Sequence, residues 1–272
     1  MINAKRRRVI RMNFKQAEFV INASIMNNGP SLLIVGPNRI GKTTMLHAIA
    51  EKFKKKVYWT NNADYGGLMN NVDKIKQKDT IIYSDLQTIL MRKTSVKNAT
   101  IGLIASWISD GKNESDDFTY HNSSATLGKN MNFIIACTTD DLNMMMRYKG
   151  TYTHLLTRCL IIRVNNDLNI DAIENEERFE LSMKPITKIN KENKEEAMKV
   201  KLDRSIGNFG RAELVRDMER ALIAIDCPIE IPFTDIEFFE PKTYIGPFKS
   251  DENKPIATKK FVPKQEKKSE NE

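Results

Sequence analysis

The sequence predicts an α/β protein built on a parallel β-sheet with helices on both faces. Three observations support this fold class: short apolar runs recur along the chain, helical or polar stretches separate them, and a glycine-rich loop follows the first run. The runs expected to form strands are Leu32–Val35, Val57–Thr60, Thr80–Ser84, Phe133–Cys137 and Leu160–Val164. Their mainly apolar character is typical of parallel strands buried on both faces.

Helices are expected where apolar residues recur at every third or fourth position. The three clearest cases are a helix directly after the glycine-rich loop, a helix at Val96–Asp110, and a helix that ends before Pro228. The residues that share a helical face are, respectively, Met45, Leu46, Ile49, Ala50 and Phe53; Val96, Leu103, Ile104, Trp107 and Ile108; and Leu214, Val215, Met218, Ala221, Leu222 and Ile225. Trp107 is therefore interpreted as a core residue. The polar stretch 111–130 is expected to be a surface loop or hairpin.

Charge and composition divide the chain into four expected parts. Residues 1–20 form a basic arm, with Lys and Arg preceding the first acidic residue, Glu18, and the arm contacts either nucleic acid phosphates or only solvent. Residues 21–167 form the core and 168–228 a helical lid. Residues 229–272 are expected to be an extended or disordered tail, because almost nothing from Ser250 onward is suited to burial.

Overall composition favours a cytoplasmic protein. The chain has 43 Lys and Arg against 35 Asp and Glu, a net charge of +8, which suits a polyanionic partner or an ordinary basic protein equally. No apolar run approaches the roughly 18 residues of a membrane helix, and no secretory signal is recognisable. No membrane partner is expected. Cys137, Cys159 and Cys227 are interpreted as reduced core thiols rather than disulfide or zinc ligands.

Residues 36–43 match the phosphate-binding pattern G-x-x-x-x-G-K-[ST] at every fixed position. In this pattern the glycines let backbone N–H groups point at phosphates, Lys42 reaches the β and γ oxygens, and the Thr43 hydroxyl ligates Mg²⁺. The strand and helix expected on either side are the context that the pattern requires. ATP and Mg²⁺ are thus the expected ligands. The nucleotide-binding residues would be Gly36, Pro37, Asn38, Arg39, Ile40, Gly41, Lys42, Thr43 and Thr44.

Asp85 is the candidate second ligand of Mg²⁺, together with Thr43. It ends the apolar run Thr80–Ser84, so its carboxylate would lie at the end of a strand near the metal. The alternative is that this Asp only caps the next turn. Leu86 follows it, where motor ATPases usually carry a Glu that polarises the attacking water. Asp110, Glu114 or Asp116 would have to supply that base from elsewhere.

Three further polar residues occupy positions that a nucleotide site would use. Thr138 follows the strand expected at Phe133–Cys137, and its alternative interpretation is a simple strand-to-loop turn. Arg158 precedes the last strand, with Arg147 as a second candidate; an isolated Arg is more often a surface ion pair. Arg211 follows Gly207-Asn208-Phe209-Gly210 at the start of the last amphipathic helix.

The order of these features resembles that of AAA+ ATPases over roughly residues 30–226. The resemblance implies that Lys42, Asp85, Thr138, Arg158 and Arg211 form the catalytic set. Thr138 would then sense the γ-phosphate, Arg158 would act as an arginine finger on a neighbouring subunit's nucleotide, and Arg211 would contact the γ-phosphate from the lid. Shorter stretches around Asp85, Ser109-Asp110-Gly111, Ala136–Asp140 and Leu156–Leu160 resemble P-loop ATPases of viruses and mobile elements.

This resemblance implies an oligomeric ATPase that acts on DNA, such as a replication initiator, helicase or helicase loader of a virus or plasmid. Its partners would be DNA and further copies of itself, for example six in a ring, and a viral chain would work in the host cytoplasm. A DNA-packaging or transfer ATPase is an alternative. So are a nucleotide or small-molecule kinase and a DNA-binding scaffold that binds ATP but barely hydrolyses it, the last favoured by Leu86.

Overall fold

The computed structural model describes residues 12–109, 127, 129–148, 150–165, 191–206, 208–233 and 260–263. Its centre is a parallel sheet of five strands in the order β2-β3-β4-β1-β5. The bounds are Ser31–Val35 for β1, Val57–Thr60 for β2, Thr80–Tyr83 for β3, Asn132–Cys137 for β4 and Cys159–Arg163 for β5. The predicted strands and their parallel arrangement are confirmed, with ends that differ by one residue at most.

Alternate residues of the strands enter two separate hydrophobic clusters, one on each face of the sheet. In β1, Leu32 and Ile34 belong to one cluster, whereas Leu33 and Val35 belong to the other. This alternation follows from the two-residue repeat of a strand, and it explains why the strands are apolar on both sides. The predicted α/β layering with helices on both faces is confirmed.

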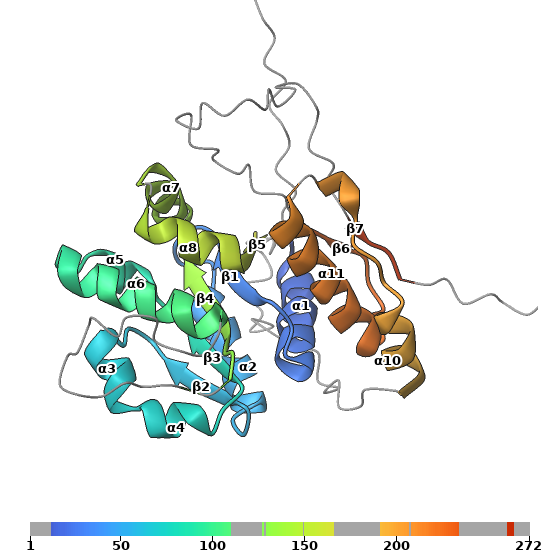
Figure 1. Cartoon of the computed structure of the whole chain (residues 1–272), viewed down its shortest axis with the longest axis horizontal. Coiled ribbons are helices and arrows are strands. Elements are labelled where there is room, and N and C mark those ends of the chain that lie inside the picture. The colour runs from blue at the N-terminus through green and yellow to red at the C-terminus, as the bar shows by residue number, and fades with distance from the viewer. Residues whose placement is uncertain are drawn as a thin grey trace, which may run out of the picture.

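The helices divide between these two faces. The first cluster includes residues of α1, α2 and α11, and the second includes residues of α3 to α8. Figure 1 shows α1 and α11 side by side, and the two helices are in contact. The bounds are Phe14–Asn27 for α1, Lys42–Lys52 for α2, Tyr65–Asn70 for α3, Val72–Lys76 for α4, Gln87–Leu90 for α5, Thr94–Ser109 for α6, Thr139–Arg147 for α7, Thr151–Arg158 for α8, Lys191–Met198 for α10 and Phe209–Ala224 for α11, with a 3₁₀ turn, η1, at Arg204–Ile206.

Helix α1 corrects the expected boundary of the basic arm. An arm ending at residue 20 is wrong, because α1 begins at Phe14 and buries Val20, Ile21 and Ile25 in the core. Asn13 and Gln16 form a capping box at its start, which fixes where the helix begins. The basic residues before position 12 lie outside the described residues.

Helix α11 is packed on the core and shares its hydrophobic cluster. Val215, Met218 and Leu222 are buried together with residues of α1, β1 and β5. The helical parts of the expected lid at 168–228 are therefore continuous with the core in the described structure. The predicted helix, expected to open at residues 207–211 and to carry Leu214 to Ile225 on one face, is confirmed: it begins at Phe209, where the Asn208 side chain accepts a hydrogen bond from the Arg211 N–H at 3.0 Å.

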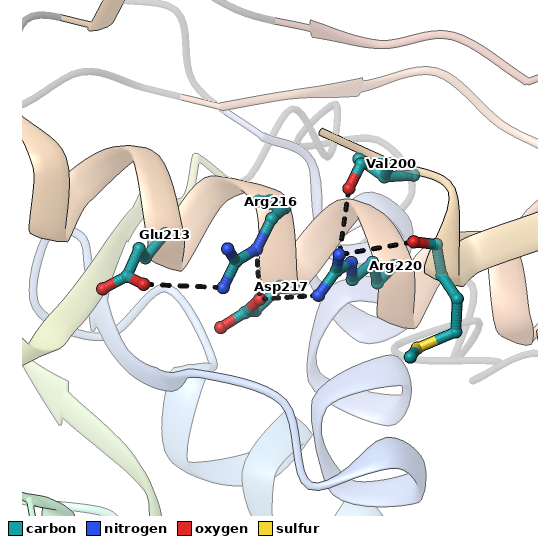
Figure 2. Close-up of polar contacts among 6 residues, drawn as sticks. Val200, Glu213, Arg216, Asp217 and Arg220 are labelled. Atoms are coloured by element: carbon teal, nitrogen blue, oxygen red, sulfur yellow. Dashed lines mark hydrogen bonds and ion pairs between the residues drawn. The ribbon is translucent and has the colours of Figure 1, made fainter. Parts of the chain in front are cut away.

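A row of charged side chains on α11 fastens the end of α10 to it (Figure 2). Arg220 donates to the carbonyls of Met198 and Val200, at 3.4 and 3.0 Å, and so caps the open C-terminus of α10. The Nε of Arg216 donates to Asp217 at 2.9 Å, and Asp217 also lies 3.8 Å from Arg220. The α10–α11 pair is thus held by hydrogen bonds to backbone as well as by apolar contacts.

The described residues of the expected tail, 229–233 and 260–263, pack on the core. Strand β6, Ile231–Pro232, pairs antiparallel with β7, Lys260–Phe261. Ile231, Phe233 and Phe261 are buried in the same cluster as α1 and α11. Almost nothing beyond Ser250 was expected to be buried, and Phe261 is an exception, because its single aromatic ring supplies enough apolar surface to anchor a short strand.

Two expectations from composition concern the cysteines and the membrane. All three cysteines are free and buried, as expected for core thiols, and burial raises the pKa of Cys159 to about 12. Among the described helices none combines the length and the apolar character needed to span a bilayer.

We expect Phe261→Ala to lower the free energy of unfolding by about 3 kcal/mol, because the substitution removes a buried ring and leaves a cavity. Val262→Ala is the matched control: Val262 is 67% exposed, so its truncation should change stability by less than about 0.5 kcal/mol. Chemical denaturation of the two variants checks this. Equal stabilities would mean that β7 does not hold the tail on the core.

Candidate nucleotide site

Three polar segments lie together at the edge where the strands end. The 36–43 segment follows β1, Asp85 follows β3, and Thr138 follows β4, which lies between those two strands. The Gly36 N–H donates to the carbonyl of Cys137 at 3.4 Å, so the first residue of the loop contacts the end of β4. In open parallel sheets, ligands bind at this carboxyl edge.

The 36–43 segment joins β1 to α2, the strand–loop–helix order that its pattern requires. A Cβ on Gly36 would lie 2.7 Å from the Ile40 side chain and 2.8 Å from the Val164 carbonyl, so only glycine fits there. Gly41 has a φ of 93° and Arg39 a φ of 61°, both in the left-handed region. Gly41 adopts this conformation without strain, whereas Arg39 does so at a cost of roughly 1 kcal/mol.

The start of α2 carries no side-chain cap. Its N-cap residue is Gly41, and no side chain accepts a hydrogen bond there, whereas Asn13, Thr138 and Asn208 cap α1, α7 and α11. The first hydrogen bond of the helix runs from the Met45 N–H to the Gly41 carbonyl. The preceding N–H groups thus remain available, at the positive end of the helix dipole, for an oxyanion.

Lys42 is folded back onto its own loop. Its ammonium group donates to the carbonyls of Gly36 and Pro37, at 2.8 and 2.7 Å. Burial lowers the pKa of Lys42, while the nearby Asp141 and Asp85 carboxylates act in the opposite direction. The cation is therefore bound by the loop carbonyls, and two acidic side chains at the same edge of the sheet act on it electrostatically.

Asp85 lies directly after β3, and both of its carboxylate oxygens accept hydrogen bonds. The backbone N–H of Gln87 donates to one oxygen at 3.0 Å, and the hydroxyl of Thr88 donates to the other at 2.7 Å. Ser84 is joined to Asn61, at the end of β2, by a hydrogen bond of 2.8 Å. Leu86 is fully buried in the second cluster, so the side chain after Asp85 packs in the core.

Thr138 uses its hydroxyl within a capping box at the start of α7. It donates to Asp141 at 2.6 Å and accepts from the Asp141 N–H at 3.0 Å. The Thr138 N–H also donates to the Asp141 carboxylate, at 2.9 Å. Sequence reasoning did not single out Asp141, although the spacing Thr-x-x-Asp was a signal for this capping box.

Arg158 lies at the opposite end of the strands from the 36–43 segment, where the strands begin. It directly precedes β5, whose first residue, Cys159, pairs with Ser31 at the beginning of β1. Its guanidinium donates to the Ser109 hydroxyl and, at 3.0 Å, to the His154 carbonyl. The length of β1 separates it from the 36–43 segment by roughly 15 Å. Arg147 ends α7 and is exposed.

A cavity of about 570 Å³ opens beside Arg158 at this second edge. The starts of β1 and β4 lie on one side of it and α10 and α11 on the other, and both charge signs occur in its lining: Asp79, Lys129, Arg158, Lys194, Asp217 and Arg220. Asp79 and Lys129 are paired at 2.8 Å. The cavity is thus separate from the edge that carries Lys42.

Arg211 lies in the first turn of α11 and is 8% exposed. Its backbone N–H is held by Asn208, while Gly207 lies outside the described residues. Because α11 packs on α1, the position of Arg211 is set by the core and not by a separate module. The candidate bases Asp110, Glu114 and Asp116 also fall outside the described residues.

No cluster of three or more His, Cys, Asp or Glu side chains with the geometry of a metal site occurs among the described residues. Thr43 is exposed at the start of α2, on the edge that also carries Asp85. A hydroxyl and a carboxylate are both hard oxygen donors, as Mg²⁺ requires, and phosphate oxygens and water usually complete its shell.

Neither the models of known protein families nor the curated proteins contain a match to this chain.

We expect Gly36→Ala to destabilise the protein by about 2 kcal/mol, because the new Cβ would press on the backbone carbonyl of Val164. Gly102→Ala is the matched control. Gly102 lies within α6, and a methyl group on its Cα would meet nothing within 4 Å, so alanine should raise stability by up to about 1 kcal/mol. Thermal unfolding of both variants measures the contrast; the same shift in both would contradict the close contact.

Proposed function

We propose that this protein binds and hydrolyses ATP with Mg²⁺, as an AAA+-like ATPase that acts on DNA. The observation that carries the proposal is the 36–43 segment, which joins β1 to an uncapped helix and has Lys42 beside two carboxylates. Uncapped N–H groups together with a lysine suit a triphosphate, and a carboxylate suits its metal ion. The other polar groups of the edge then surround the place where a γ-phosphate would lie.

The residues fit the roles that ATP hydrolysis requires. Lys42 would exchange its two backbone carbonyl acceptors for phosphate oxygens, and Thr43 and Asp85 would hold Mg²⁺, Asp85 with its orientation set by Gln87 and Thr88. Bound Mg²⁺ would neutralise charge on the β and γ oxygens. Thr138 would act through Asp141, because its hydroxyl hydrogen is already donated to that carboxylate.

The position of Arg158 means that it could act as an arginine finger only in an oligomer. A guanidinium at the far edge of the sheet cannot reach the nucleotide of its own subunit, since the separation of roughly 15 Å exceeds the length of an arginine side chain. A neighbouring copy docked against this edge would bring its nucleotide to Arg158. The role of arginine finger therefore requires a self-assembled complex, such as a ring.

DNA is proposed as the partner on charge. The chain has a net charge of +8, and five Lys and Arg residues precede Met12. Phosphate contacts of such segments supply binding that is independent of sequence and sensitive to salt. Replication, helicase loading, packaging and transfer all remain within this proposal.

A nucleotide or small-molecule kinase is the second candidate, because the same phosphate-binding segment serves phosphotransfer. One observation weakens both the kinase and the lid role expected for Arg211 in an ATPase: α11, which carries Arg211, is packed into the core cluster and is not a free lid over the 36–43 segment. Incubation with ATP and nucleoside monophosphates separates the two candidates. A scaffold that binds ATP without hydrolysing it is the third.

We expect Lys42→Ala to abolish ATP binding and turnover, because it removes the ammonium group held between the phosphate-binding loop and two carboxylates. Lys55→Ala, an exposed position after α2, is the control and should leave both unchanged. Titration with a fluorescent ATP analogue and release of phosphate are the measurements. Unaltered ATP binding by Lys42→Ala would contradict the nucleotide site.

DNA binding by the Lys42 variant should persist and weaken steeply between 50 and 200 mM salt, by about a thousandfold if six phosphates are contacted.

We expect Arg158→Ala to retain ATP binding but to reduce turnover by about 1,000-fold, because the charge that stabilises the transition state would be lost. Arg92→Ala, at an exposed position after α5, removes the same charge elsewhere and should have no effect. The thermal midpoint must be recorded as well, since Arg158 also ties α8 to Ser109 on α6. Normal turnover in folded Arg158→Ala would show that the finger assignment is wrong.

A further inference from the structure

Hydrolysis at the proposed site needs a group that accepts a proton from the attacking water. The position after Asp85 cannot supply it, because Leu86 is fully buried and apolar. Asp85 already has other roles: its two oxygens accept hydrogen bonds from Gln87 and Thr88, and it is the proposed metal ligand. The base must therefore come from another element at the same edge of the sheet.

Asp141 is placed to do this. It lies in the first turn of α7, directly after β4, and β4 runs between the strands that carry the 36–43 segment and Asp85. Its carboxylate lies near enough to Lys42 to act on it electrostatically, as that of Asp85 does. The contact between the Gly36 N–H and the Cys137 carbonyl fixes the end of β4 beside the loop.

The hydrogen bonds of Asp141 orient the carboxylate and leave part of it open. Thr138 donates both its N–H and its hydroxyl to Oδ2, at 2.9 and 2.6 Å. Within the described part of the chain, the other oxygen, Oδ1, accepts no hydrogen bond. Asp141 is 7% exposed, so the group is nearly excluded from solvent but still accessible at that oxygen. A fixed carboxylate with one open oxygen is what a general base requires.

We propose that Asp141 is the general base of the ATPase and that Thr138 is its positioning residue; the inference rests on the proposed function. In the step, the oxygen of water attacks the γ-phosphorus and its proton passes to Oδ1 of Asp141. The bond from the γ-phosphorus to the β,γ-bridging oxygen breaks, and its electron pair stays on ADP. The carboxylic acid then returns the proton to solvent, so that ATP and water yield ADP and inorganic phosphate.

Lys42 and Asp85 complete the surroundings of this carboxylate. The Lys42 ammonium group interacts electrostatically with the Asp141 carboxylate and with the Asp85 carboxylate. Cys137 lies beneath them, and burial raises the pKa of its thiol, so it stays neutral and adds no competing charge.

The test is Asp141→Asn in the full-length protein, compared with Asp140→Asn. An Asn oxygen still accepts both hydrogen bonds from Thr138, so the capping box is kept while the base is lost. Asp140 lies one residue earlier in the same helical turn and is exposed, so its amide variant removes the same charge from the same helix terminus. Thr138→Val and Thr138→Ser form a second pair, the first without and the second with the hydroxyl.

Turnover by Asp141→Asn should fall at least about 100-fold, while its affinity for a fluorescent ATP analogue stays within about threefold of the unaltered protein, because the loss is confined to the transition state. Asp140→Asn should hydrolyse ATP normally. Thr138→Val should lose turnover with unchanged ATP affinity, and Thr138→Ser should recover it. Turnover of Asp141→Asn within about threefold of normal would overturn the inference alone. If the unaltered protein bound no ATP, the proposed function itself would fail.

Discussion

The site depends on one constraint of the sheet: β4 lies between β1 and β3. Its backbone hydrogen-bonds to both neighbours, in registers that align Val35 with Cys137 and Tyr83 with Ile135. The residues that follow the three strands are therefore brought to one edge by main-chain geometry, independently of any side-chain contact. All three strands are buried on both faces, so their positions are among the hardest in the molecule to shift. A catalytic group placed there inherits that rigidity.

The sequence allowed most of this scaffold to be predicted. The strands could be predicted because apolar runs such as Leu32–Val35 have the length of a strand and are too short for a typical helix. The helix around Leu214–Ile225 could be predicted because its apolar residues recur at every third or fourth position. The boundaries of the elements, and the residues that they bury, were harder to predict from the sequence. The basic residues near the N-terminus favoured an arm over residues 1–20, whereas Phe19, Val20 and Ile21 make α1 part of the core. Phe261 is an isolated apolar residue, so no periodic pattern predicted its burial.

The candidate site was predictable where a pattern is local and not where it depends on the fold. The spacing of Gly36, Gly41 and Lys42 is fixed by the loop itself, whereas the proximity of Asp141 to Lys42 follows from the strand order, which the spacing of motifs along the chain does not determine. The same limit applied to Arg158: its place before β5 was readable, but its location across the sheet from Lys42 became visible only with the strand register.

The folded-back Lys42 has a thermodynamic consequence. Its ammonium group already has two backbone acceptors, the carbonyls of Gly36 and Pro37, so the ligand-free loop satisfies its own cation. An incoming anion competes with these carbonyls, and the net gain from the lysine is the difference between two sets of hydrogen bonds. Weakly charged ligands gain little from such an exchange, whereas a group with several ionised oxygens gains more, because charge-assisted hydrogen bonds are the stronger kind. In the proposed nucleotide site, the loop would thereby discriminate between ligands by their charge before any other residue makes contact.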